Sequence, residues 1–123
     1  MQNDLVLSDI EILSSNISNI FDILLDASLA SRKIGKKTKI RAEKESNCFL
    51  SLKDKIIQKL NNNDIYKNKI LRYIDDVINA LDNIRSGMLL NCYIYTGRSS
   101  LERLSIFVKS LIEEMVNCES INF

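Results

Sequence analysis

The sequence predicts an all-α fold, an antiparallel four-helix bundle with long amphipathic helices. The chain of 123 residues contains no proline and only three glycines, so little in it interrupts helices. Apolar residues recur at spacings of three and four, which is the period of one helix face. Short polar stretches join the periodic segments, and short connections favour antiparallel neighbours within a single domain over residues 1–123.

The first two helices are expected over about residues 8–34 and 38–60. Gly35 is a plausible stop for the first, with Arg32 and Lys33 in the last turn, where cations suit the helix dipole. Its predicted core stripe is Ile10, Leu13, Ile17, Ile20, Leu24 and Ala27, widened by Ile12 and Ile23. The second helix is predicted to face inward with Ala42, Phe49, Leu52, Ile56 and Leu60.

The last two helices are expected over about residues 64–95 and 99–118. An asparagine-rich loop at 61–64 caps the third helix, and Thr96 with Gly97 is expected to end it. Ser99 and Glu102 match the capping box at a helix start. The pattern leaves open whether the third helix is continuous through Gly87. The predicted stripes are Ile70, Ile74, Val77, Leu81, Ile84 and Met88, then Leu101, Leu104, Val108, Leu111 and Met115.

The charge is nearly balanced overall but uneven along the chain. A net charge of +1 removes any argument for polyanion binding by the protein as a whole. Residues 1–31 hold five acids and no base, whereas residues 32–44 hold seven bases and one acid. No apolar segment approaches the ~20 residues that span a bilayer, and no secretory signal is evident. A cytoplasmic location without membrane contact is therefore the default expectation.

The residue types present exclude much chemistry. The absence of histidine removes Ser-His and Cys-His nucleophile pairs and histidine metal sites. There is no glycine-rich phosphate loop, and the neighbouring carboxylates Asp75 and Asp76 are expected on the solvated surface. Cys48, Cys92 and Cys118 form no Cys-x-x-Cys pair and are expected to be reduced packing residues. We expect no enzyme, catalytic residue, cofactor, metal or small-molecule substrate.

One basic segment is the candidate nucleic-acid surface. Its residues are Arg32, Lys33, Lys36, Lys37, Lys39, Arg41 and Lys44. Ile34 and Ile40 could pin this segment onto the end of the bundle. Two other interpretations stay open: plain solvated charge, or ion pairing with an acidic stripe of Glu11, Asp22 and Asp26 on the first helix.

A second candidate surface has few charges. Ser15, Ser18 and Asn19 occupy positions that exposed helices usually fill with charged residues, and interface centres are depleted of charge. Tyr93, Tyr95 and Arg98 form a second candidate patch for a partner protein or a homo-oligomer.

The last 55 or so residues carry a resemblance to a known family. Three stretches carry it. A long helix, ILRYIDDVINALDNIRSGMLL, is followed by a glycine-containing turn with a serine cap, YIYTGRSSLERL, and by a final amphipathic helix, VKSLIEEM. This arrangement resembles the small four-helix-bundle family of ribosomal-RNA intervening-sequence proteins and the accessory variability proteins of diversity-generating retroelements. The resemblance implies a ring-forming bundle that binds nucleic acid or a reverse transcriptase through basic surfaces.

The function expected from the sequence is therefore that of a non-enzymatic accessory protein. It self-associates and contacts nucleic acid through residues 32–44. The alternative is a protein-only adaptor, chaperone, antitoxin or inhibitor that docks on its partner through a helical face.

Overall fold

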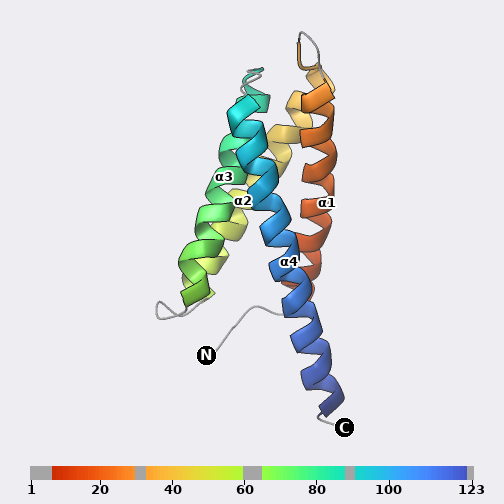
Figure 1. Cartoon of the computed structure of the whole chain (residues 1–123), viewed down its shortest axis with the longest axis vertical. Helices are drawn as coiled ribbons and strands as arrows, with labels where there is room; N and C mark the ends of the chain where they lie inside the picture. Colours follow the sequence, from red (N-terminus) through yellow and green to blue (C-terminus); the bar gives the residue numbers. More distant parts are fainter. Residues whose placement is uncertain (1–6, 30–32, 60–64, 88–90, 122–123) are drawn as a thin grey trace.

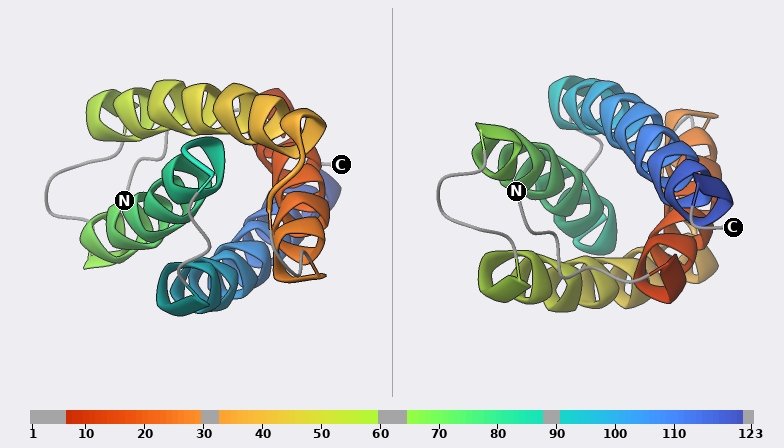
Figure 2. Two further views of the ribbon diagram at one scale, coloured as in Figure 1. Left: turned by 90° about the horizontal axis from the view of Figure 1, so that it is seen from above. Right: turned by 90° about the horizontal axis from the view of Figure 1, so that it is seen from below.

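A computed structural model describes residues 7–29, 33–59, 65–87 and 91–121, and these residues form four helices (Figure 1). Their bounds are α1 Leu7–Leu29, α2 Lys36–Lys59, α3 Ile65–Arg85 and α4 Asn91–Ile121. Neighbouring helices run antiparallel. Viewed along the bundle, they surround a common core in the order α1, α2, α3, α4 (Figure 2). The predicted all-α bundle is confirmed.

Each helix packs mainly against two neighbours. α1 contacts α2 and α4, and α3 contacts the same two helices from the opposite side. We call the end where α1 and α3 finish and α2 and α4 begin the upper end (Figure 1). The last turns of α4 continue past the opposite end of the bundle (Figure 1). None of the described helices combines the length and apolar character needed to cross a membrane.

The core follows the predicted stripes closely. Fully buried residues include Ile20, Ile23, Leu24, Phe49, Ile56, Ile74, Leu81, Ile84, Leu101 and Leu104. The side chains of Ile10, Leu60, Met88, Leu111 and Met115 lie outside the described residues. The prediction for Ile12 is wrong, because its side chain is 58% exposed. Ile12 lies one position before Leu13, so it points about 100° away from the core stripe.

The chain reverses between α3 and α4 at Gly87, which corrects the predicted third helix of 64–95. The Gly87 N–H donates to the Ile84 carbonyl at 2.9 Å, and Gly87 has φ of 81°. This left-handed conformation is the common glycine ending of a helix, because a side chain there would clash with the backbone. Residues 88–90 lie outside the described residues.

The sequence predicted that Gly97 ends a helix. This is wrong, because Gly97 lies buried inside α4. A Cβ atom added there would stand 2.5 Å from the Cβ atom of Ala80 on α3. Two small residues therefore let α3 and α4 approach closely. Ser99 and Glu102 also lie within α4, so the predicted capping box is wrong.

The connection from α1 to α2 also differs from the prediction. α1 ends at Leu29 instead of near Gly35, so Lys33 lies outside any helix. The Gly35 carbonyl accepts a hydrogen bond from the Lys39 N–H at 3.1 Å, so Gly35 directly precedes the start of α2. Ile34 is 1% exposed and anchors this turn as predicted, but Ile40 is 57% exposed and does not. The predicted loop at 61–64 lies outside the described residues.

Candidate interaction surfaces

The described part of the basic segment lies at the upper end of the bundle. Lys36, Lys37 and Lys39 occupy the first turn of α2, which contains no acidic residue, and Lys33 precedes it by three positions. The N-terminal turn of a helix already carries a positive partial charge. The segment therefore concentrates positive charge without local compensation. Arg32 lies outside the described residues.

Two residues of this segment have intramolecular roles. The Lys39 side chain lies against the Gly87 turn, with its Nζ atom 3.0 Å from the position of a Cβ added at Gly87. An ammonium group there faces the negative end of the α3 dipole. Arg41 forms an ion pair with Asp26 of α1 at 3.4 Å. The predicted alternative of ion pairing with the acidic stripe thus applies to Arg41.

Three lysines around the start of α2 are left for an external ligand. Lys33, Lys36 and Lys37 are exposed, and within the described ranges none of them has a hydrogen bond or ion pair. Lys33 and Lys36 line a shallow hollow together with Ile34, Gly35 and Lys39. This hollow offers an anion positive charge from both sides of the α2 start.

Glu45 is a buried carboxylate that the sequence analysis missed. It is 6% exposed, and its Oε2 atom has no hydrogen-bond partner among the residues that the structure describes. Burial raises the pKa of Glu45, while Lys44, a hydrogen bond with Asn19 and Arg41 oppose the rise. The signal was present in the pattern, because Glu45 falls between Ala42 and Phe49 at the spacings of three and four that mark the core face. Lys44 is exposed and adjoins this buried charge.

A groove follows the line where α1 meets α4. Its upper hollow is lined by Phe21, Asp22, Leu24, Leu25, Ser28, Ile94, Tyr95 and Arg98. A second hollow is lined by Ser14, Ile17, Ser18, Phe21, Ser105, Val108, Lys109 and Ile112. Phe21 belongs to both, so the two hollows adjoin. We call them together the α1/α4 groove.

The predicted partner residues divide with respect to this groove. Tyr95 and Arg98 line its upper hollow and Ser18 its lower one. Ser15 and Tyr93 are exposed and line neither hollow.

Asn19, also predicted to meet a partner, is exposed and lines neither hollow, and its side chain lowers the pKa of Glu45 by hydrogen bonding. It therefore has a role within the fold.

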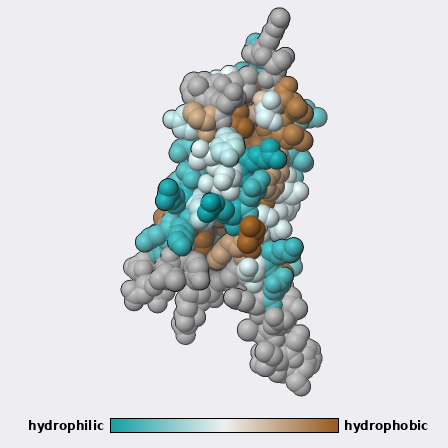
Figure 3. All heavy atoms as spheres, in the orientation of Figure 1, coloured by the Kyte–Doolittle hydropathy of each residue, from teal (hydrophilic) through white to brown (hydrophobic). Residues whose placement is uncertain are grey.

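Exposed apolar residues on α1 escaped the sequence analysis. Leu25 is 52% exposed and Leu29 73% exposed, one helical turn apart. Apolar atoms gather over the upper part of the α1 side of the molecule (Figure 3). Their spacing of four was a usable signal, because it lies off the stripe of Ile20, Leu24 and Ala27.

Asp75 and Asp76 were expected on the solvated surface; this holds for Asp75 in part, since its side chain is 49% exposed, but both take part in contacts between helices. Asp75 pairs with Lys53 of α2 at 2.7 Å, and Asp76 accepts a hydrogen bond from Ser100 of α4 at 2.7 Å. Both are half-buried and join α3 to different neighbours. Within the described ranges, no three Cys, Asp or Glu residues gather where they could hold a metal ion.

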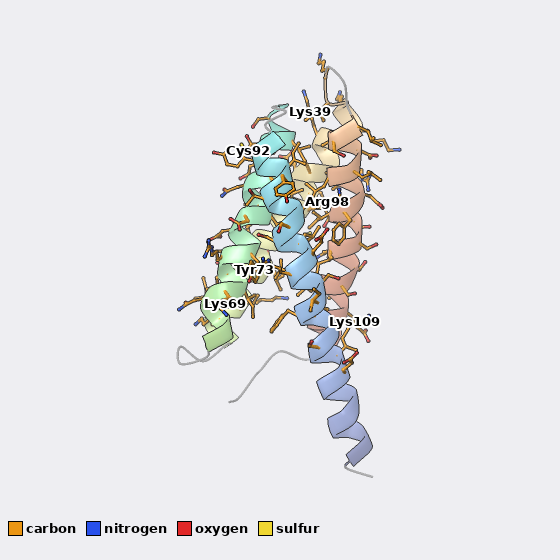
Figure 4. All side chains as sticks on the ribbon, viewed as in Figure 1. Lys39, Lys69, Tyr73, Cys92, Arg98 and Lys109 are labelled. Atoms are coloured by element: carbon orange, nitrogen blue, oxygen red, sulfur yellow. The ribbon has the colours of Figure 1, made fainter. Side chains whose placement is uncertain are left out.

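The cysteines only partly match their predicted packing role. Cys48 is half-buried, but Cys92 is exposed on α4, so the prediction is wrong for Cys92 (Figure 4). Cys118 lies among the side chains that the structure leaves undescribed.

No protein-family model matches this chain, and comparison with curated proteins and with solved structures found no match either. The resemblance to the intervening-sequence and accessory variability proteins therefore stays a prediction.

Proposed function

We propose that this protein is a non-enzymatic accessory protein that binds nucleic acid through the lysines at its upper end. The observation that carries the proposal is a set of three exposed lysines around the start of α2, Lys33, Lys36 and Lys37, which have no partner in the part of the chain that the structure describes. Like charges so close together repel one another, and a phosphate backbone would relieve that repulsion and release counterions.

The surrounding structure supports a fixed arrangement of these lysines. Ile34 is buried between Lys33 and Lys36 and holds their backbone against the core. Lys39 contacts the turn that ends α3, so the start of α2 is held from a second side. Lysines in such a cluster contact the phosphate groups of a nucleic acid and not the edges of its bases. We therefore expect binding without strong sequence preference.

The test compares two triple variants with the same change in charge. Lys33, Lys36 and Lys37 are changed to Glu in the first, and Lys69, Arg72 and Lys109 in the control. The control residues are also exposed, and Lys69 and Lys109 lie in the lower half of the bundle, far from Lys39 (Figure 4). Fluorescence anisotropy measures binding to duplex DNA, single-stranded DNA and structured RNA at 50 and 200 mM salt.

For three phosphate contacts, wild-type affinity should fall on the order of 40-fold between the two salt concentrations. The upper-end variant should lose this binding, and the control variant should retain most of it. Glutamates in the first turn of α2 suit the helix dipole, so loss of binding would not reflect unfolding. Circular dichroism checks this point. Equal loss in both variants would refute a dedicated site.

The α1/α4 groove favours a second candidate function, a protein-only adaptor. The groove combines exposed apolar side chains with Tyr95 and Arg98, residue types enriched at protein interfaces. If neither triple variant changes nucleic-acid binding, this second function becomes the better one.

A further inference from the structure

The upper hollow of the α1/α4 groove exposes apolar surface that the fold itself does not cover. Tyr95 is 77% exposed on the α4 wall, and Leu25 is 52% exposed on the α1 wall. Leu29, 73% exposed, follows Leu25 by one turn of α1. Contiguous exposed apolar residues bordered by polar ones are typical of interaction sites.

The two walls of this hollow carry opposite charges. Asp22 lies on the α1 wall and Arg98 on the α4 wall. The lower hollow agrees with this, because α1 contains acids and no Lys or Arg, and Lys109 lines the α4 wall there. The exposed acids Glu102 and Glu113 of α4 line neither hollow. An acidic wall, an apolar centre and a basic wall form a pattern that complements itself after a two-fold rotation.

We propose that the occupant of the groove is a second copy of this chain, bound about a two-fold axis. Asp22 of each copy then faces Arg98 of the other, and Leu25 and Tyr95 are covered between them. Arg98 can change partners at little cost. Its contact with Glu102 in the same helix is 3.7 Å long, with both side chains more than half exposed.

This proposal goes beyond nucleic-acid binding and can fail independently of it. The groove residues are separate from Lys33, Lys36 and Lys37. Changing those lysines to Glu should leave the molecular mass of the dimer in solution unchanged.

Charge reversal tests the two-fold arrangement directly. In the Asp22→Arg variant the new arginine of each copy faces Arg98 of the other copy. In the Arg98→Glu variant the new glutamate of each copy faces Asp22 of the other. Each single variant should weaken self-association at least about tenfold, because like charges now meet twice in each dimer. An equimolar mixture of the two variants pairs Arg with Glu and Asp with Arg, so it should form a mixed dimer. The double variant should dimerise alone.

Sedimentation velocity measures the mass over a range of concentrations. Native mass spectrometry, with one variant carrying a small mass tag, identifies the mixed dimer. Thermal unfolding by circular dichroism must show that each single variant is folded. The covering of the apolar centre is tested by Leu25→Gln, which leaves Asp22 and Arg98 intact and should also weaken the dimer.

Three results would overturn the proposal. Wild-type protein that is monomeric at all concentrations would leave the groove to a different protein. Single variants that dimerise as well as wild type would place the interface elsewhere. Folded, monomeric variants that do not form a mixed dimer would rule out the pairing of Asp22 with Arg98.

Discussion

α1 and α3 pack against the same two helices, yet they are held in different ways. α3 is joined to α2 by Ser46–Asp82 at 2.9 Å and Lys53–Asp75 at 2.7 Å, and to α4 by Ser100–Asp76 at 2.7 Å. α1 has an exposed ion pair of 3.4 Å with α2 and the hydrogen bond between Asn19 and Glu45. Among the side chains that the structure describes, no hydrogen bond or ion pair joins α1 to α4.

The difference shows that an apolar stripe buries a helix but does not determine how tightly it packs. Both helices have regular stripes, and their central residues are fully buried. Tight packing of α3 comes from half-buried polar pairs and from small residues at the α4 contact. α1 has no polar contact of this kind with α4 among the described side chains, and it leaves hollows that a ligand or partner can enter.

Gly97→Ala should reduce the stability of the fold more than the other substitutions, because it forces α3 and α4 apart. The added Cβ atom would lie 2.5 Å from that of Ala80. Overpacking costs about 1 to 3 kcal/mol, and the better helix propensity of alanine returns roughly 1 kcal/mol at most. We expect a net loss of about 1 to 2 kcal/mol in urea unfolding.

The double variant Ala80→Gly, Gly97→Ala restores the space between the helices and should recover part of that loss. Coupling of less than about 0.3 kcal/mol between the two positions would contradict the steric explanation.

Two aspartates allow a matched test of the polar contacts of α3 and α1. Asp76→Ala leaves the Ser100 hydroxyl without its partner, and Ser100 is only 5% exposed. We expect a cost of about 1 kcal/mol. Asp26→Ala removes the exposed pair with Arg41, for which we expect a change below about 0.5 kcal/mol. Equal losses in chemical denaturation would show that α1 and α3 are held alike.

Glu45→Gln should alter how stability depends on pH. Because burial raises the pKa of Glu45, the folded state binds its proton more tightly than the unfolded state does. The stabilisation is present below the unfolded pKa of about 4.3 and is lost as pH rises through the folded value. The variant lacks this loss, so its stability relative to wild type should rise as the pH increases from 4 to 8.

The stability difference between wild type and the Gln variant, measured by thermal unfolding from pH 4 to pH 8, isolates this residue from the other acids. A difference that does not change with pH would show that Glu45 keeps its ordinary pKa.

Tyr95→Ser should have the smallest effect on the fold. The side chain is 77% exposed, so the free energy of unfolding of the monomer should change by less than about 0.5 kcal/mol. Sedimentation velocity should in contrast show weaker self-association. A large loss of monomer stability in dilute protein would mean that Tyr95 belongs to the core.

The sequence predicts the core well because the helix period is a local property of the backbone. Leu81 and Leu104 needed no tertiary information to be assigned inward. The roles of Gly87 and Gly97 could not be assigned in this way. Glycine disfavours a helix interior equally at both positions. Gly97 is a packing residue because Ala80 of α3 comes close to it, and this contact is not visible in the sequence of α4. Gly87 forms the turn, where it has a positive φ.

The interaction surfaces were predictable in part, for a related reason. The cluster of lysines is visible in the sequence, and the structure places its described part at one end of the bundle. The partners of Arg41 and Lys39 depend on how α2 is rotated relative to α1 and α3, which no local pattern reports. The apolar groove depends on the space between α1 and α4, and therefore on tertiary packing alone.

The packing order around the bundle also bears on how the chain folds. Contacts of α2 with α3, and of α3 with α4, join helices that follow each other in sequence, and they are more extensive than the contact of α1 with α2. The contact between α1 and α4 joins distant parts of the chain and has the highest closure entropy. We therefore expect α2, α3 and α4 to assemble first. Docking of α1 onto α4 is then the late step, and α1 is the first helix to detach when the protein opens.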